Sequence, residues 1–344
     1  MTSLLEREIA SQPGLIAALL HRELPHVREI IAQLPPFSYA LIAARGSSDH
    51  AATYAKYSWG ALAGFPVALA TPSLYTIYQT PPRLADALVI GVSQSGQSPD
   101  IVAVLAEARR QGRPTLAITN DPASPLGATS DAVIALGVGA EQSVAATKTY
   151  LAEVAVMALL AAGWSADAAR MAELEALPDT LQSTREGTAE IAGLIARYQG
   201  MESCTIISRG YNYATAFELA LKLRELTYTL ASAYSSADFR HGPIASIQKD
   251  SPVILMMPNG AAYADLYDLA LDLRAREADL LVISDNPDAL ALATTPLPLA
   301  TSAPDWLSPL TAILPGQEFA LRLALARGLD PDAPRGLRKV TRTL

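Results

Sequence analysis

Residues 88–98 read Leu-Val-Ile-Gly-Val-Ser-Gln-Ser-Gly-Gln-Ser, an apolar run that ends in small hydroxyls, amides and glycine. A helical pattern follows from Pro99 to Ala106. The stretch predicts a buried strand, a turn and the start of a helix. Backbone N–H groups at a helix N-terminus carry partial positive charge, so this turn is suited to an anion such as phosphate. A polar turn with an ordinary N-cap is the alternative that the stretch alone leaves open.

The same pattern occurs twice in the chain. Three strand-and-turn segments of the first half recur in the second half at an offset of 164 or 165 residues, which indicates two copies of one domain. Each copy alternates apolar runs with helical periodicity, which predicts an α/β fold with a parallel sheet between helices. The matched pairs are residues 44–46 with 208–210, 89–96 with 253–260, and 115–121 with 280–286.

We expect five parts along the chain. Ligands of parallel sheets bind beyond the C-terminal strand ends, so the turns that follow the strands are candidate sites. The first helical segment should be interrupted near Gln12-Pro13-Gly14, and a last helix should open at Pro315 and run to Arg327. The expected parts are an N-terminal helical segment (1–34), a first domain (35–170), a linking helix (171–200), a second domain (201–329) and a C-terminal tail (330–344); the candidate turns are 45–48, 93–98, 209–213 and 258–260.

Composition restricts the function classes. The 344 residues are 50% hydrophobic and suit two domains of ordinary size. The net charge of −8 disfavours nucleic acid as a partner. No apolar run approaches the roughly 20 residues of a membrane helix, and no signal peptide is recognisable, so we expect a cytoplasmic protein. The single cysteine, Cys204, lies in an apolar run and is expected to be a core residue.

The hydroxyl-rich turn differs from the common nucleotide-binding loops. Gly91 and Gly96 have the Walker A spacing, but Gln97 stands where that motif requires lysine, and no dinucleotide fingerprint follows a strand. A loop poor in cations suits a small monophosphate such as a sugar phosphate better than a magnesium-bound triphosphate. No cluster has metal-ligand spacing, and we expect neither a catalytic metal nor another cofactor.

Candidate acid/base groups occur in the second copy. Glu218, Lys222 and Glu225 lie at i, i+4 and i+7, which places them along one stripe of a helix. A solvated ion-pair face is the alternative, although the flanking residues are mostly apolar. His241 precedes Gly242-Pro243 in a turn and is the only imidazole of the second copy. It is either an ordinary loop histidine or an acid/base group.

These motifs, in this order, resemble one family. The chain is similar, over nearly its whole length, to the isomerase half of glucosamine-6-phosphate synthase (glutamine–fructose-6-phosphate aminotransferase), which consists of two sugar isomerase (SIS) domains. The segment 44–50 looks more like the glucosamine-6-phosphate deaminases of the same fold. The motifs that carry the resemblance are Ser93–Ser98, Val144-Ala145-Ala146-Thr147-Lys148, Glu218–Glu225, His241-Gly242-Pro243 and Pro334–Lys339.

The resemblance implies a role for each site residue. Glu225 would move a proton between C1 and C2, with help from Lys222 and Glu218. His241 would open the sugar ring and reach the site of a neighbouring subunit in a homodimer. Lys339, in a tail folded over the site, would form a Schiff base with the open ketose. The residues that would bind the sugar phosphate are Ser48, Ser93, Gln94, Ser95, Ser98 and Val144.

The expected reaction is deamination of an amino-sugar phosphate. The sequence begins Met-Thr-Ser and lacks the N-terminal cysteine of a glutaminase, so we expect glucosamine 6-phosphate and water to give fructose 6-phosphate and ammonia. Ala146 stands where synthase-type relatives carry serine, which leaves the amine open. The alternatives are a fructosamine-6-phosphate deglycase, ammonia-dependent glucosamine-6-phosphate synthesis and a non-catalytic sugar-phosphate sensor.

Overall fold

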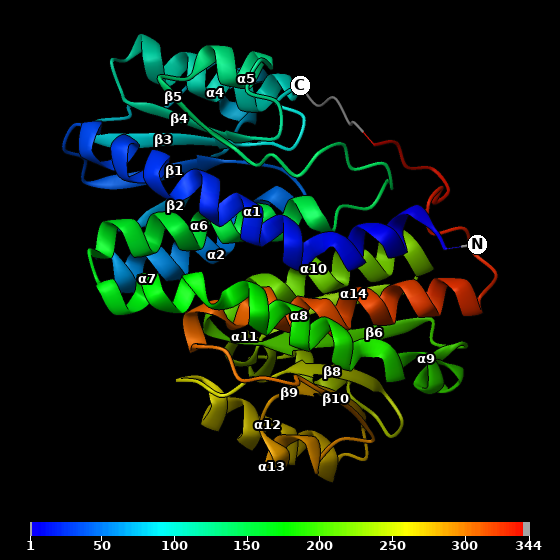
Figure 1. The fold of residues 1–344 in the computed structure, drawn as a ribbon. Helices are drawn as coiled ribbons and strands as arrows, with labels where there is room; N and C mark the ends of the chain where they lie inside the picture. Colours follow the sequence, from blue (N-terminus) through cyan, green and yellow to red (C-terminus); the bar gives the residue numbers. More distant parts are fainter. Residues whose placement is uncertain (1, 340–344) are drawn as a thin grey trace. The chain divides into compact units, whose positions relative to one another are not determined.

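A computed structural model describes residues 2–339 and contains two five-stranded parallel sheets (Figure 1). The first sheet has the order β2-β1-β3-β4-β5 and the second the order β7-β6-β8-β9-β10. This architecture confirms the predicted α/β fold. The strands are β1 (Tyr39–Ala43), β2 (Val67–Leu69), β3 (Ala87–Val92), β4 (Thr115–Thr119), β5 (Ala132–Ala135), β6 (Ser203–Ser208), β7 (Leu230–Ser235), β8 (Pro252–Met256), β9 (Asp279–Ser284) and β10 (Thr295–Pro298).

The duplication extends to the register of the strands. Leu41 lies opposite Val89 in the first sheet, and Thr205 lies opposite Val253 in the second, so both partners shift by the same 164 positions. A slip of one residue would exchange the two faces of a strand. The two sheets therefore share their strand order and also the assignment of side chains to faces.

Two compact units contain the two sheets. Of the described residues, the first-repeat unit comprises Gly14–Glu141, Lys148–Glu175, Arg338 and Lys339. Its sheet carries α4 (Pro99–Arg110) and α5 (Pro125–Thr129) on one face (Figure 1). The other helices of this unit are α2 (Ser47–Leu62), α3 (Ser73–Thr76), α6 (Lys148–Ser165) and α7 (Ala168–Glu175), of which α2 and α6 pack against each other.

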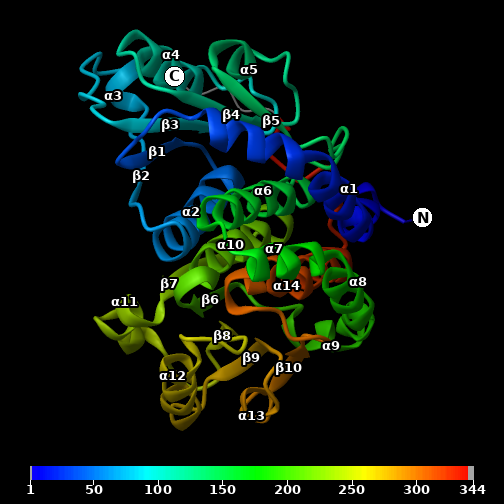
Figure 2. The same ribbon diagram turned by 60° about the vertical axis from the view of Figure 1, so that its left-hand side comes forward.

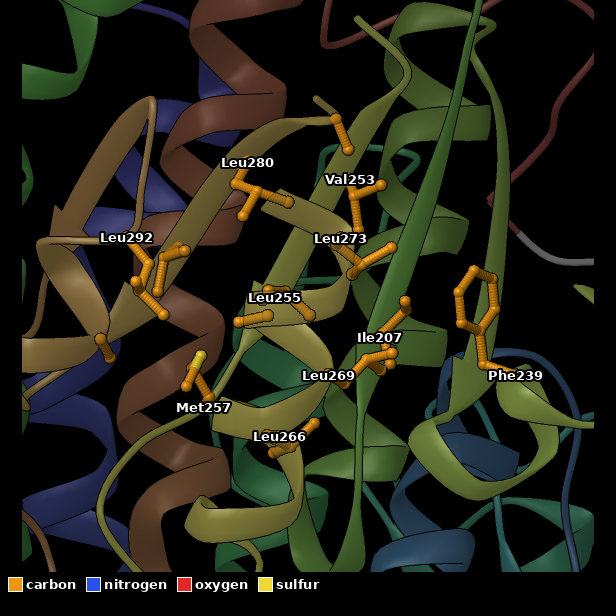
Figure 3. Packing of buried hydrophobic residues seen from close by; sticks show 14 of the residues in the cluster. Ile207, Phe239, Val253, Leu255, Met257, Leu266, Leu269, Leu273, Leu280 and Leu292 are labelled. Carbon is orange, nitrogen blue, oxygen red and sulfur yellow. The ribbon is translucent and has the colours of Figure 1, made fainter. Parts of the chain in front are cut away.

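The second-repeat unit comprises residues up to Pro13, Gln142–Thr147 and Ala176–Leu337. Leu266, Leu269 and Leu273 of α12 pack against Val253 and Leu255 of β8, and Figure 3 shows these side chains in one apolar cluster. Figure 2 shows α12 beside β8 and β9. The helices are α8 (Leu177–Gly187), α9 (Ile191–Leu194), α10 (Tyr213–Thr227), α11 (Ser236–Arg240), α12 (Tyr263–Ala275), α13 (Pro287–Leu290) and α14 (Ser308–Ala326), of which α10 and α14 pack against each other.

Two helices differ from the sequence expectation. The helix α1 (Leu4–Gln33) continues through Pro13, and α14 begins at Ser308, seven residues before Pro315. A proline inside a helix removes one backbone hydrogen bond. In α1 the apolar side chains before and after Pro13 are buried, and in α14 residues 308–321 are all buried. The expected interruption and the expected helix start were wrong because this burial outweighs the lost bonds.

Among residues 2–339 no helix is both long enough and apolar enough to cross a membrane.

Candidate functional site

The loop Ser93–Ser98 joins β3 to α4 in the first-repeat unit. Gly96 has a φ of +61°, and its N–H donates to the carbonyl of Ser93, while the N–H of Gln97 donates to Ser95 Oγ. A Cβ at Gly96 would lie 2.0 Å from Ser124 Oγ, so this position requires glycine. The loop thus turns tightly at the N-terminus of a twelve-residue helix.

Several donors of this loop remain open. Ser98 is the N-cap of α4, but its hydroxyl makes no capping hydrogen bond. Within residues 2–339 the hydroxyls of Ser93 and Ser98 and the N–H groups of Ser95 and Ser98 have no hydrogen-bond partner. Because these donors lie at the positive end of α4, the loop can accommodate a phosphate.

Arg45 is not one of the open donors. Its Nε and Nη2 each lie 3.0 Å from Oδ2 of Asp100, which is fully buried in the first turn of α4. The second repeat contains the equivalent ion pair, in which Arg209 Nη1 lies 3.0 Å from Asp265 Oδ2. Since both repeats have it, this ion pair belongs to the common fold.

In the second repeat, the carboxylate of Asp305 occupies the equivalent loop. Asp305 Oδ2 accepts the N–H of Ala261 at 2.9 Å, and a Cβ at Gly260 would lie 2.2 Å from Asp305 Oδ1. The N–H of Asn259 donates to Asp285. Residues 258–260 are therefore a candidate turn whose anion position is occupied by side chains, in contrast to the open loop of the first repeat.

The helix α10 carries the predicted charge row. Lys222 Nζ lies 2.5 Å from Glu225 Oε2 and 3.4 Å from Glu218 Oε1. Glu218 and Lys222 are 0% exposed, whereas Glu225 is partly exposed. This burial excludes the solvated ion-pair face that the sequence left open. Buried ion pairs carry a desolvation penalty and are frequent at functional sites, so the row is a candidate catalytic group.

His241 and Ser48 have different surroundings. His241 is exposed at the C-terminal end of α11, and its ring makes no hydrogen bond within the described part of the chain. In the second-repeat unit the structure therefore joins Glu218, Lys222 and Glu225 to one another but does not join His241 to them. Ser48 is buried in the first turn of α2, and its hydroxyl donates to Glu153 Oε1 at 2.8 Å.

Val144 lies on a segment that α1 holds in place. The Glu8 carboxylate accepts the N–H of Gln142 at 2.6 Å, the N–H of Ser143 at 3.3 Å and the Ser143 hydroxyl. Val144 itself is partly exposed. Glu8 stands in no local pattern of the sequence that predicts this role.

Lys339 is anchored by a residue that the sequence analysis missed. Its Nζ lies 2.8 Å from Glu141 Oε2, and Gln94 Nε2 donates to the same oxygen at 3.0 Å. Glu141 directly precedes the segment that contains Val144, and this position is the one feature of the sequence that could have marked Glu141 as a site residue. The first-repeat unit thus connects the open loop to Lys339 through one carboxylate.

Cys204 is buried in β6, as expected of a core residue. Burial raises the pKa of its thiol to about 12. A thiolate is the nucleophilic form of cysteine, so Cys204 is not a nucleophile at neutral pH.

Comparisons with known proteins place the chain in a family. The SIS domain model matches residues 39–163 and again residues 201–324. A glutamine–fructose-6-phosphate aminotransferase of Gloeobacter violaceus is 34% identical over 97% of this chain, and the chain spans 57% of that relative. A crystal structure of a candidate phosphosugar isomerase from Silicibacter pomeroyi is 35% identical, covers 96% of this chain and 100% of its own, and superimposes with a TM-score of 0.85.

The fold is also that of a more distant structure. A glucosamine-6-phosphate deaminase from Thermotoga maritima, 20% identical, superimposes with a TM-score of 0.83 over 99% of this chain and 100% of its own. The chain belongs to the sugar-phosphate isomerase (SIS) family, has two tandem SIS domains, and is related over nearly its whole length to glutamine–fructose-6-phosphate aminotransferase.

Proposed function

We propose that the protein converts glucosamine 6-phosphate and water to fructose 6-phosphate and ammonia. The observation that carries the proposal is the buried row of Glu218, Lys222 and Glu225, in which one carboxylate is partly exposed and ion-paired. A carboxylate of this kind can carry a proton between adjacent carbons. The open donors of Ser93–Ser98 are suited to the phosphate of the substrate.

In the proposed mechanism Glu225 removes the C2 proton of the open-chain aldose while Lys222 donates a proton to O1. Glu225 then delivers its proton to C1, and the C2 amine returns a proton to Lys222 as it becomes an imine. Lys339 adds to C2 and expels ammonia, and water hydrolyses the resulting Schiff base to the ketone of fructose 6-phosphate. Lys222 fixes the Glu225 carboxylate, and His241, contributed by a partner subunit in a homodimer, opens the ring.

One feature of the sequence favours release of ammonia. Residues 44–50 resemble the deaminases of this fold. Free ammonia is a poor amine donor at low concentration, which also favours the deaminating direction.

A substrate panel tests the proposal. Ammonia and fructose 6-phosphate should appear in equal amounts from glucosamine 6-phosphate. Release of an amino acid from a fructosamine 6-phosphate, without ammonia from glucosamine 6-phosphate, would instead establish a deglycase. A folded protein that binds fructose 6-phosphate but turns over none of these compounds would indicate a non-catalytic sugar-phosphate sensor.

The variant Glu225→Gln should retain its fold and lose about 10²- to 10⁴-fold in kcat, because the amide cannot carry the proton. Ammonia release under saturating glucosamine 6-phosphate measures the loss. The matched control is Glu202→Gln, an exposed glutamate of the same unit, which should keep wild-type activity. Full activity in Glu225→Gln would remove Glu225 from the mechanism.

A further inference from the structure

We propose that Glu141 is the positioning residue for Lys339 and that it couples this end of the tail, Arg338 and Lys339, to the Ser93–Ser98 loop. The inference rests on the proposed function for the role of Lys339. It concerns residues of the first-repeat unit alone, and its test does not require turnover.

The two oxygens of the Glu141 carboxylate have separate tasks. Oε1 accepts the N–H of Thr149 at 3.2 Å, which caps the first turn of α6. Lys148 Nζ holds the same segment by donating to the carbonyl of Ala140 at 2.8 Å. Oε2 accepts from both Gln94 Nε2 and Lys339 Nζ. The helix therefore fixes one oxygen and presents the other to the loop and the tail.

Burial makes this arrangement specific. The Glu141 side chain is 0% exposed and the Lys339 side chain is 24% exposed, so solvent screens the Lys339 ion pair less than a surface pair. A buried carboxylate must be matched by donors, and Gln94 and Lys339 supply two of them. Without the Lys339 contact the buried Oε2 would have one hydrogen-bond donor fewer. The docked position of Lys339 is therefore favoured.

Sharing of one oxygen connects the loop to the tail. Gln94 belongs to the loop proposed to hold phosphate, and its backbone is also fixed by the N–H of Asn120, which donates to its carbonyl at 3.1 Å. A ligand that orders the loop also fixes Gln94, and through it the carboxylate that receives Lys339. Linkage then requires the docked Lys339 to strengthen phosphate binding by the same factor.

The key variant is Glu141→Gln. Its amide oxygen can still accept the N–H of Thr149, so the cap of α6 survives, but its NH₂ group would face the two donors at the former Oε2. Glu175→Gln, an exposed glutamate of the same unit, is the matched control. Amide hydrogen exchange of Arg338 and Lys339, the described tail residues of the first-repeat unit, reports docking, and titration with inorganic phosphate and with fructose 6-phosphate reports binding.

In the wild type and the control, both ligands should slow exchange of Arg338 and Lys339. In Glu141→Gln this exchange should be at least fivefold faster without ligand and insensitive to inorganic phosphate, and Kd should rise about five- to tenfold. Inorganic phosphate cannot form a Schiff base, so its effect is independent of the chemistry of Lys339. Wild-type exchange and an unchanged phosphate response in Glu141→Gln would overturn the proposal.

If Glu141→Gln folds poorly, a double-mutant cycle that keeps Glu141 tests the coupling instead. Gln94→Leu and Lys339→Met each remove one donor to Oε2 and leave the carboxylate in place. If the shared oxygen couples them, the double variant should bind inorganic phosphate about as weakly as the weaker single variant. Strictly additive effects would show that Gln94 and Lys339 act independently and would contradict the coupling. These readouts remain valid even if glucosamine 6-phosphate is not the substrate.

Discussion

At the scale of single residues, Gly96 decides the shape of the open loop. Its φ of +61° lies in the left-handed region, and a Cβ there would collide with Ser124. Both the strain and the clash are local, so a substitution should deform the loop before it affects the sheets.

Gly96→Ala should therefore lower the free energy of unfolding by about 1–3 kcal/mol and weaken binding of fructose 6-phosphate. Chemical denaturation and calorimetric titration measure the two effects. Gly60→Ala is the control, since Gly60 lies in α2 with nothing within 4 Å of its Cβ position. That substitution should stabilise the helix by about 0.5–1 kcal/mol. Unaltered stability and binding in Gly96→Ala would show that the loop tolerates a side chain.

At the scale of elements, the first turns of α1 hold the segment Gln142–Thr147. The Glu8 carboxylate satisfies two backbone N–H groups and the Ser143 hydroxyl in a buried environment. This contact fixes the segment on which Val144 lies.

Glu8→Ala should cost about 1–3 kcal/mol of stability, because buried donors lose their acceptor. It should also raise KM for glucosamine 6-phosphate more than it lowers kcat, since the segment binds substrate in the proposed function. Glu8→Gln, which keeps one acceptor oxygen, should be intermediate. Equal stability of all three proteins in denaturant would show that the segment does not depend on Glu8.

At the scale of the whole molecule, two copies of one domain have different loops. The first repeat leaves donors open at Ser93–Ser98, whereas Asp305 fills the equivalent position at the start of α12. Both repeats nevertheless contain the same ion pair at the start of the following helix, Arg45–Asp100 in the first and Arg209–Asp265 in the second. Within residues 2–339 the duplication therefore gives two similar folds, and of these two equivalent loops the first leaves donors open and the second is filled by Asp305.

Calorimetric titration with fructose 6-phosphate should accordingly give one site per chain. Asp305→Asn should lower stability by about 1 kcal/mol, because it removes a negative charge from the N-terminal end of α12. It should leave the stoichiometry at one. Two equivalent sites per chain in the wild type would show that Asp305 does not close the second loop.

The sequence predicted those features that depend on local pattern or repetition. The strands and their parallel pairing follow from apolar periodicity and the 164-residue offset, and the row on α10 follows from the helical spacing of its three charged residues. Pro13 and Pro315 misled the prediction of helix limits, because tertiary burial overrides a local breaker. Glu141 and Asp305 were missed, since each acts on residues distant in sequence and stands in no recognisable local pattern.

Binding of a sugar phosphate by the first repeat is tested most directly by a crystal structure of the protein with glucosamine 6-phosphate. The phosphate should lie within hydrogen-bond distance of the N–H groups of Ser95 and Ser98 and of the Ser93 and Ser98 hydroxyls. A phosphate bound elsewhere, with the Ser93–Ser98 donors left open, would contradict the proposed site.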